Sequence, residues 1–152
     1  MSVAADTTRN SEVPSADAHM ALGLSEQPRI LVVEDEYLVA MMMENDLDEA
    51  GFNIVGIANS AEKAVAMALT EKPDFIIMDI RLIGERDGID AALEIFTKTG
   101  IRCLFATAHG DAQSKTRAAA ASPLGWLQKP YGRAALVGAV RDAAAQLKAP
   151  RA

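Results

Sequence analysis

Five apolar runs alternate along the chain with segments whose apolar residues recur at helical spacing. The runs cover residues 29–35, 52–58, 74–79, 101–107 and 124–130. Near-continuous apolar runs such as "RILVV" are typical of strands buried on both faces, which favours a parallel sheet covered by helices. Strict alternation of strand and helix therefore predicts an α/β fold with right-handed crossovers and a doubly wound sheet.

The segments between the runs predict five helices, at 36–51, 60–73, 87–100, 111–121 and 132–149. Ser60 is expected to cap the second helix, and Gly51, Lys72-Pro73 and Gly100 are expected to end the first three. The fourth segment has a weak apolar face and predicts a short helix. The inward-facing residues are expected to be Val39, Met42, Met43, Leu47 and Ala50, then Ile89, Ala92, Leu93 and Phe96, then Leu136, Val137, Val140, Ala144 and Leu147.

The ends of the chain differ from the alternating part. Residues 1–28 are rich in Ala, Ser, Asp and Thr and are interpreted as a mobile tail, although "HMALGL" at 19–24 could pack on the domain. The alternating pattern fills residues 29–148 as one domain, and 149–152 form a short tail. No segment for a DNA-binding or catalytic output domain is recognised.

Composition excludes several classes of protein. The net charge is −6 and no basic stripe is present, which argues against nucleic acid or an anionic membrane surface as a partner. No apolar run approaches the ~18 residues of a membrane span, and no secretory signal is recognisable. The single cysteine, Cys103, lies in an apolar run and is expected to be a core residue. We therefore expect a cytoplasmic protein.

Polar residues collect where the expected strands end. Glu34 and Asp35 follow the first strand, Asp79 ends the third, Thr107 ends the fourth, and Lys129 ends the fifth. In a doubly wound sheet the functional crevice lies beyond the carboxyl ends of the strands, so these groups are expected to converge. Each has a simpler explanation taken alone: Asp35 could cap a helix, and Lys129 could lie on the surface. For all of these residues to be unrelated, four separate coincidences at four strand ends would be needed, so a single shared site is the better explanation.

The converging groups suit one kind of chemistry. Clustered carboxylates repel one another unless a cation neutralises them, and an open all-oxygen set suits Mg²⁺. One carboxylate can also attack a phosphoryl group and form an aspartyl-phosphate. The incoming phosphoryl oxygens would need donors, which Lys129, Thr107 and backbone N–H groups could supply.

Four motifs give the chain a family resemblance. They are "LVVEDE" (31–36), "IIMDIRL" (76–82), "FATA" (105–108) and "QKPY" (128–131). In this order and spacing they resemble the receiver domain of two-component response regulators over residues 29–148. The resemblance implies a flavodoxin-like fold, with a five-stranded parallel sheet of order 2-1-3-4-5 and helices on both faces.

The resemblance also implies roles for individual residues. Asp79 would be the phospho-acceptor. Mg²⁺, for which Mn²⁺ could substitute, would be bound directly by Asp35, through water by Glu34, and by the backbone carbonyl of Arg81. Thr107 and Lys129 would bind the phosphoryl group, helped by the N–H groups of Arg81 and Ala108, and the Lys129–Pro130 bond would be cis.

Further residues are implicated less directly. Trp126 occupies the place of the aromatic switch residue of receivers, or simply fills the sheet edge. His109 and Arg81 occupy positions that tune hydrolysis of the acyl phosphate, although a lone histidine is more often a surface residue. Leu38 and Met41 are expected to face outward, beside the acids, as a docking strip for a kinase. Scattered surface apolar residues are the plainer interpretation.

Three departures from the common receiver pattern stand out. Ile83 replaces a proline four residues after the acceptor, and the loop at 83–88 is one residue longer than usual. "FATAH" resembles the Phe-Ala-Thr (FAT GUY-like) variant of single-domain alphaproteobacterial regulators, and "DIRL" with "DGIDAA" resembles receivers of their general stress response.

These features predict a stand-alone response regulator rather than an enzyme with diffusible substrates. It would take a phosphoryl group from a histidine kinase or histidine phosphotransfer protein. It would then contact a downstream protein, form a homodimer, or act as a phosphate sink. One alternative is a receiver-fold interaction module that works without phosphorylation. Another is a haloacid-dehalogenase-type hydrolase, which needs a second acid where this chain has Arg81.

Overall fold

The computed structural model describes residues 27–108 and 112–148, and its elements follow the predicted alternation. The five strands are β2 (Arg29–Val33), β3 (Asn53–Ala58), β4 (Phe75–Asp79), β5 (Arg102–Thr107) and β6 (Gly125–Gln128). The helices are α2 (Tyr37–Glu49), α3 (Ala61–Glu71), α4 (Gly88–Thr99), α5 (Ala112–Ala118) with the 3₁₀ turn η1 (Ala119–Ala121), and α6 (Arg133–Lys148). The α/β class predicted from the sequence is confirmed.

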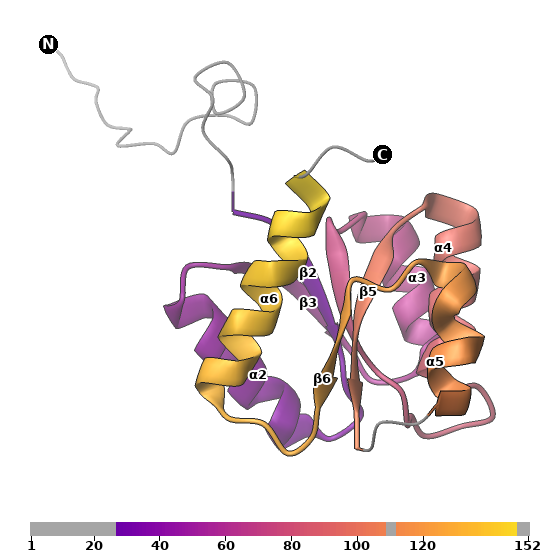
Figure 1. Cartoon of the computed structure of the whole chain (residues 1–152), viewed down its shortest axis with the longest axis horizontal. Coiled ribbons are helices and arrows are strands. Elements are labelled where there is room, and N and C mark those ends of the chain that lie inside the picture. The colour runs from indigo at the N-terminus through magenta and orange to yellow at the C-terminus, as the bar shows by residue number, and fades with distance from the viewer. Residues whose placement is uncertain (1–26, 109–111, 149–152) are drawn as a thin grey trace, which may run out of the picture.

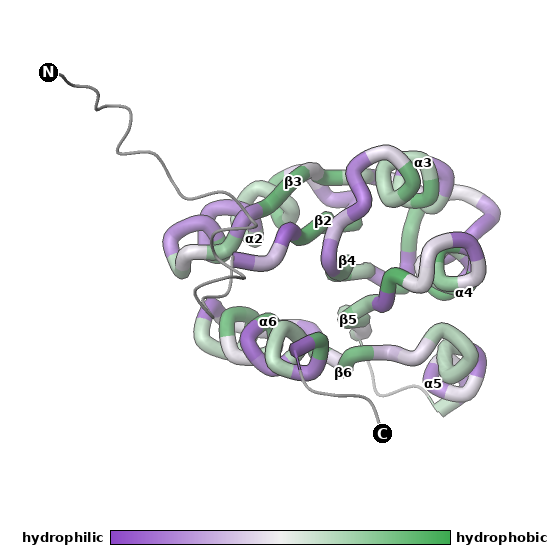
Figure 2. The backbone as a smooth tube through the Cα atoms, turned by 90° about the horizontal axis from the view of Figure 1, so that it is seen from above, coloured by the Kyte–Doolittle hydropathy of each residue, from purple (hydrophilic) through white to green (hydrophobic). Residues whose placement is uncertain are grey.

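The strands form one parallel sheet in the order β3-β2-β4-β5-β6. Counted along the described chain this is the predicted order 2-1-3-4-5. Figures 1 and 2 show α2 and α6 on one face of the sheet and α3, α4 and α5 on the other. The carboxyl ends of β2, β4, β5 and β6 therefore lie at one edge, as the crossover rule requires.

Two apolar cores flank the sheet because successive strand side chains point to opposite faces. In β4, which is buried along its whole length, Ile76 and Met78 pack toward α3, α4 and α5. Phe75 and Ile77 pack toward α2 and α6. Cys103 is buried in the first of these cores, as predicted, and burial raises the pKa of its thiol far above the ordinary range. A central strand buried on both sides holds Asp79, its last residue, firmly in place.

The predicted helix boundaries are largely confirmed. Ser60 caps α3 through the hydrogen bond that Lys63 N donates to Ser60 Oγ at 3.1 Å. Lys72, Gly51 and Gly100 each adopt positive φ angles at or just after helix ends, where glycine or a left-handed residue closes the last turn. The Lys129–Pro130 peptide bond is cis, as expected.

Two predicted inward positions are wrong. Met42 was expected to face the core but is 66% exposed, because the buried stripe of α2 consists of Ala40, Met43 and Leu47. Leu147 is 37% exposed, near the end of α6.

Other inward predictions need refinement. Ala143 belongs to the buried stripe of α6, and Ala144 only packs against its edge. In α4 the fully buried face includes Ile95, and Leu93 and Phe96 are half-buried beside it. Small residues facing the sheet allow close packing, and a sequence pattern that rewards only large apolar residues does not find them.

The chain ends lie largely outside the described residues. The expected tails at 1–28 and 149–152 are described only at Gln27 and Pro28, so the predicted mobility and the packing of "HMALGL" stay predictions. No helix within 27–108 and 112–148 is both long enough and apolar enough to cross a membrane.

Candidate functional site

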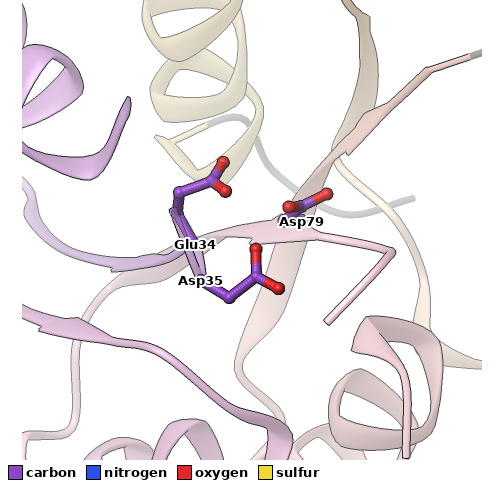
Figure 3. Close-up of side chains that lie close together, drawn as sticks. All are labelled: Glu34, Asp35 and Asp79. Carbon is purple, nitrogen blue, oxygen red and sulfur yellow. The ribbon is translucent and has the colours of Figure 1, made fainter. Parts of the chain in front are cut away.

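Three carboxylates meet at the carboxyl edge of the sheet (Figure 3). One oxygen each from Glu34, Asp35 and Asp79 lies within 4.8 Å of the others. Glu34 and Asp35 directly follow β2, and Asp79 ends β4. Because β2 pairs with β4 in parallel, these strand ends are neighbours. Glu34 and Asp79 are buried and Asp35 is partly open to solvent. The grouping predicted from the sequence is thus present.

Lys129 is the cation that faces these acids. Its Nζ lies 3.2 Å from Asp79 Oδ2 and 3.5 Å from Glu34 Oε1. The backbone N–H of Lys129 donates to the Thr107 carbonyl at 2.7 Å, which ties the end of β6 to the end of β5. Lys129 is therefore part of the site and not a solvated surface lysine.

The charge balance of the site shows in its pKa values. Burial, and then the charge of Asp79, raise the pKa of Glu34 to about 7. Burial also raises the pKa of Asp79, against the opposing effect of Lys129. Although burial lowers the pKa of Lys129, the charges of Asp79 and Glu34 raise it above its ordinary value. One ammonium does not neutralise two buried acids, so the site favours a further positive charge.

The donor set fits a hard divalent cation. All three side chains offer carboxylate oxygens, which Mg²⁺ prefers, and the partial openness of Asp35 leaves room for metal-bound waters. Asp35 Oδ2 accepts a hydrogen bond from Ile83 N at 3.1 Å. Helix α2 begins after Glu36 without a side-chain cap, so Asp35 is not the helix cap that was the simpler alternative.

A cavity of about 380 Å³ opens above Asp79. Its walls are Asp79, Ile80, Arg81, Ala106, Thr107, Ala108, Ser114 and Lys129. The predicted phosphoryl-binding residues Thr107 and Lys129 are both present, and the N–H of Arg81 donates to the Asp79 carboxylate. Ser114 was not predicted, because its segment offered only a weak helical pattern. An acidic nucleophile, a cation and hydroxyl donors around one cavity can receive a phosphoryl group.

The loop after β4 connects the cavity to α4. Gly88, the first residue of α4, donates its N–H to the Ile80 carbonyl at 2.7 Å. A Cβ atom at Gly88 would lie 2.0 Å from the carbonyl oxygen of Asp79. The helix therefore starts directly against the backbone of the candidate acceptor, and only glycine fits there.

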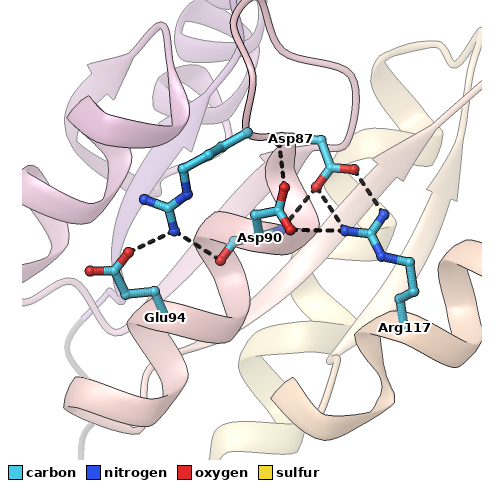
Figure 4. Close-up of polar contacts among 5 residues, drawn as sticks. Asp87, Asp90, Glu94 and Arg117 are labelled. Atoms are coloured by element: carbon cyan, nitrogen blue, oxygen red, sulfur yellow. Dashed lines mark hydrogen bonds and ion pairs between the residues drawn. The ribbon is translucent and has the colours of Figure 1, made fainter.

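Charged side chains join α4 to α5 (Figure 4). Asp87 caps α4 in a capping box with Asp90. Arg117 of α5 contacts Asp87 at 2.9 Å and Asp90 at 3.0 Å. Burial alone would raise the pKa of Asp87. The contact with Arg117 outweighs this effect and lowers that pKa below its usual value. The start of α4 beside Asp79 is thus linked to α5 by a bidentate ion pair.

The remaining predicted residues fall into three groups. Trp126 lies half-buried on the edge strand β6, stacked on Phe105 with ring centroids 4.9 Å apart, and Lys115 Nζ lies 5.4 Å from its ring. This geometry fits the sheet-edge interpretation, and the switch role stays a prediction. Leu38 is 74% and Met41 37% exposed, so both face outward as expected. His109 lies outside the described residues.

Comparisons with known proteins show the family to which this chain is similar. The family profile of the response regulator receiver domain matches residues 30–141. The transcriptional regulatory protein PdtaR of Mycobacterium tuberculosis is 36% identical over 135 residues, which cover 89% of this chain and 63% of PdtaR. The chain thus spans less than two thirds of that relative. The chemotaxis protein CheY of Thermotoga maritima is 29% identical over 113 residues, or 74% of this chain and 93% of CheY.

A solved structure shows the same likeness. The signal receiver domain of a modulated diguanylate cyclase from Desulfovibrio desulfuricans aligns with a TM-score of 0.72 at 30% identity. The alignment covers 80% of this chain and 97% of that domain. The profile alone matches well over half of the chain. Fold, site geometry and similarity agree, and the chain belongs to the response regulator receiver domain family.

Proposed function

We propose that this chain is a stand-alone response regulator that accepts a phosphoryl group on Asp79 in a Mg²⁺-dependent reaction. The observation that carries the proposal is the position of Asp79. Its carboxylate is buried and lines the cavity, within 4.8 Å of a carboxylate oxygen from each of two further acids and 3.2 Å from Lys129. A structural acid would not need the companion acids, whose mutual repulsion is costly.

The proposed donor is a phosphohistidine of a histidine kinase or a histidine phosphotransfer protein. The Asp79 carboxylate attacks phosphorus, the bond from phosphorus to the histidine nitrogen breaks, and an acyl phosphate forms. Lys129 and Thr107 bind the phosphoryl oxygens, with the N–H groups of Arg81 and Ala108. Glu34, Asp35, Asp79 and the Arg81 carbonyl would hold Mg²⁺, which supplies charge neutralisation at the transferring group. Mn²⁺ prefers similar oxygen ligands and could replace it.

The proposed docking surface for the donor lies on α2. Leu38 and Met41 are exposed on α2, the helix that follows Glu34 and Asp35 in the chain. A second cavity of about 650 Å³ is lined by other residues of α2, among them Val39 and Met42, and by Lys129 and Tyr131. Met side chains adapt to different partners, which suits a docking surface near the phosphoryl site.

Output is proposed to be contact with a downstream protein, a homodimer, or drainage of phosphoryl groups from the pathway. The competing function is an interaction module of the same fold that works without phosphorylation. The assignment to the Phe-Ala-Thr (FAT GUY-like) variant stays a prediction, since the family match does not distinguish it.

Intact-mass spectrometry after incubation with phosphoramidate tests the proposal. Wild type should gain one phosphoryl group only when Mg²⁺ or Mn²⁺ is present, and Asp79→Asn should gain none. Asp142→Asn, which changes an exposed acid of α6, is the matched control and should behave as wild type. No addition to wild type, under conditions that load a known receiver and with a candidate kinase also inactive, would favour the interaction module.

A further inference from the structure

Few polar side chains of the described residues are buried, and almost all belong to the site. The buried polar or charged residues within 27–108 and 112–148 are Glu34, Asp79, Thr107 and Ser114. Burying a polar group costs free energy unless its hydrogen-bonding capacity is used. Three of the four have roles in the proposed phosphoryl transfer. Ser114, only 8% exposed, has none assigned so far.

Ser114 lines the same cavity as Asp79. Helix α5 buries Ser114 and Ala118, one turn apart, so the serine lies on the inward face of the helix. It is one of the walls of the cavity of about 380 Å³, with Thr107 and Lys129. The other hydroxyl of this helix, Thr116, is exposed, and its Oγ1 donates to the Ala112 carbonyl at 3.0 Å. The helix thus places one hydroxyl-bearing residue at the cavity and the other at the surface.

The cavity has room for water beside a phosphoryl group. A water molecule in a liquid takes about 30 Å³, so a cavity of this size holds a phosphoryl group and several waters. Two donors of the cavity are already directed at the carboxylates: Lys129 pairs with Glu34 and Asp79, and the Arg81 N–H donates to Asp79. A serine hydroxyl has one donor and two acceptor sites, so it can keep a contact within the protein and still bind water.

We propose that Ser114 is a positioning residue that orders a water molecule in this cavity and so sets the lifetime of the phosphorylated state. The inference rests on the proposed phosphorylation of Asp79. In the step that it affects, the water oxygen bonds to phosphorus and the bond from phosphorus to the Asp79 oxygen breaks. The electron pair returns to the carboxylate. Both water protons leave with the phosphate as H₂PO₄⁻, which then equilibrates with solvent.

The test separates loading from loss of the phosphoryl group. Wild type and Ser114→Ala are loaded with phosphoramidate and Mg²⁺, the donor is removed, and the phosphorylated fraction is followed by intact mass. Ser114→Ala should load at the wild-type rate but lose the group about three- to tenfold more slowly, the effect of one hydrogen bond. Ser114→Thr keeps the hydroxyl and should restore a decay rate near that of wild type. Thr116→Ala, the matched control, should not change it.

Each outcome bears on the inference. A folded Ser114→Ala whose decay rate stays within about twofold of wild type would overturn it, since one hydrogen bond predicts more. Equal slowing of loading and decay, or equal slowing in Thr116→Ala, would also overturn it, because a general loss of order in α5 would then be the cause. If wild type does not load at all, the proposed function fails first. If wild type loads normally and Ser114→Ala loses the phosphoryl group at the wild-type rate, this inference alone fails and the proposed function stands.

Discussion

At the scale of single residues, the site holds more negative than positive charge, since three carboxylates face one ammonium group. Glu34 and Asp79 are buried and share one cation, Lys129, at 3.5 and 3.2 Å. The raised pKa of Glu34, about 7, means that near neutral pH the metal-free site holds a proton that a divalent cation would displace. Like charges therefore repel each other in the metal-free site, and binding of a divalent cation would relieve this repulsion.

Glu34→Gln should change both stability and metal binding. A carboxyl whose pKa is raised in the folded state binds more protons folded than unfolded, so it destabilises the fold as pH rises above the unfolded value. At pH 8 without Mg²⁺ we expect Glu34→Gln to raise the free energy of unfolding by on the order of 1–2 kcal/mol. At pH 5 the difference should nearly vanish.

The same substitution should also reduce the stabilisation of the protein by added Mg²⁺. Mg²⁺ should raise the melting temperature of wild type at pH 8, less so at pH 6 where protons compete, and should raise that of Glu34→Gln less, since this variant keeps only the carboxylates of Asp35 and Asp79. Thermal melts at the two pH values, with and without Mg²⁺, measure both effects. A wild-type melting temperature that is independent of pH between 5 and 8 in metal-free buffer would contradict this account of Glu34.

Sequence reasoning located most of this site because its residues stand at fixed points of a regular pattern. Asp79 and Thr107 end strands and Lys129 directly follows one, and parallel strands bring their ends together. Ser114 was not predicted because it lies in a short helix with several polar residues, and the sequence does not show which of them faces inward. Its inward orientation is set by the packing of α5, which a short pattern of this kind does not determine.

At the scale of elements, the junction between β4 and α4 is the tightest part of the site. The loop residues Ile83 and Arg81 donate to Asp35 and Asp79, and Asp87 then caps α4. The helix starts at Gly88 against the backbone of Asp79. Asp79 and the start of α4 are consequently fixed to each other through backbone contacts.

Gly88→Ala should damage this junction. The new Cβ would meet the Asp79 carbonyl oxygen at 2.0 Å and its carbon at 2.9 Å, and backbone atoms in a central strand cannot give way easily. We expect a loss of about 2 kcal/mol or more in the free energy of unfolding. Phosphoramidate loading should also slow, because a shift of the loop displaces the Arg81 N–H. Urea denaturation and intact mass measure these effects.

The matched control for that substitution is Gly138→Ala in α6. Nothing lies within 4 Å of a Cβ at Gly138, and alanine is the better helix former by about 0.5–1 kcal/mol. The control should therefore be as stable as wild type or more so, with unchanged loading. Equal stability of the two variants would show that the close approach at Gly88 does not constrain the fold.

Element types and ends were predictable because strands, caps and glycine stops have local causes. Ser60 and Gly100 act where the pattern predicted them. The rotation of a helix about its axis was less predictable. In α2 the choice between Met42 and Ala40 for the inward face depends on how close the helix lies to the sheet. That closeness is a tertiary property, and the triple Met run allowed either rotation.

At the scale of the whole molecule, the two cores lie between Ile30 and Ala143. The profile of the family covers nearly the same span, residues 30–141. The interior strand β2 pairs with β3 on one side and β4 on the other. This placement predicts that residues 29–148 carry the stability of the fold and its phosphoryl chemistry, as the sequence pattern also indicated.

A chain that begins at Gln27 should therefore melt within about 2 °C of the full chain, which corresponds to roughly half a kcal/mol. It should load phosphoryl groups at the same rate. A chain that begins at Val33 is the contrasting variant. It lacks Ile30, Leu31 and Val32, which are fully buried in a strand hydrogen-bonded on both sides, and should not fold cooperatively. Circular-dichroism melts and intact mass compare the three chains. A large loss of stability on removing residues 1–26 would show that the domain begins earlier, and would direct attention to "HMALGL" as a part of the fold.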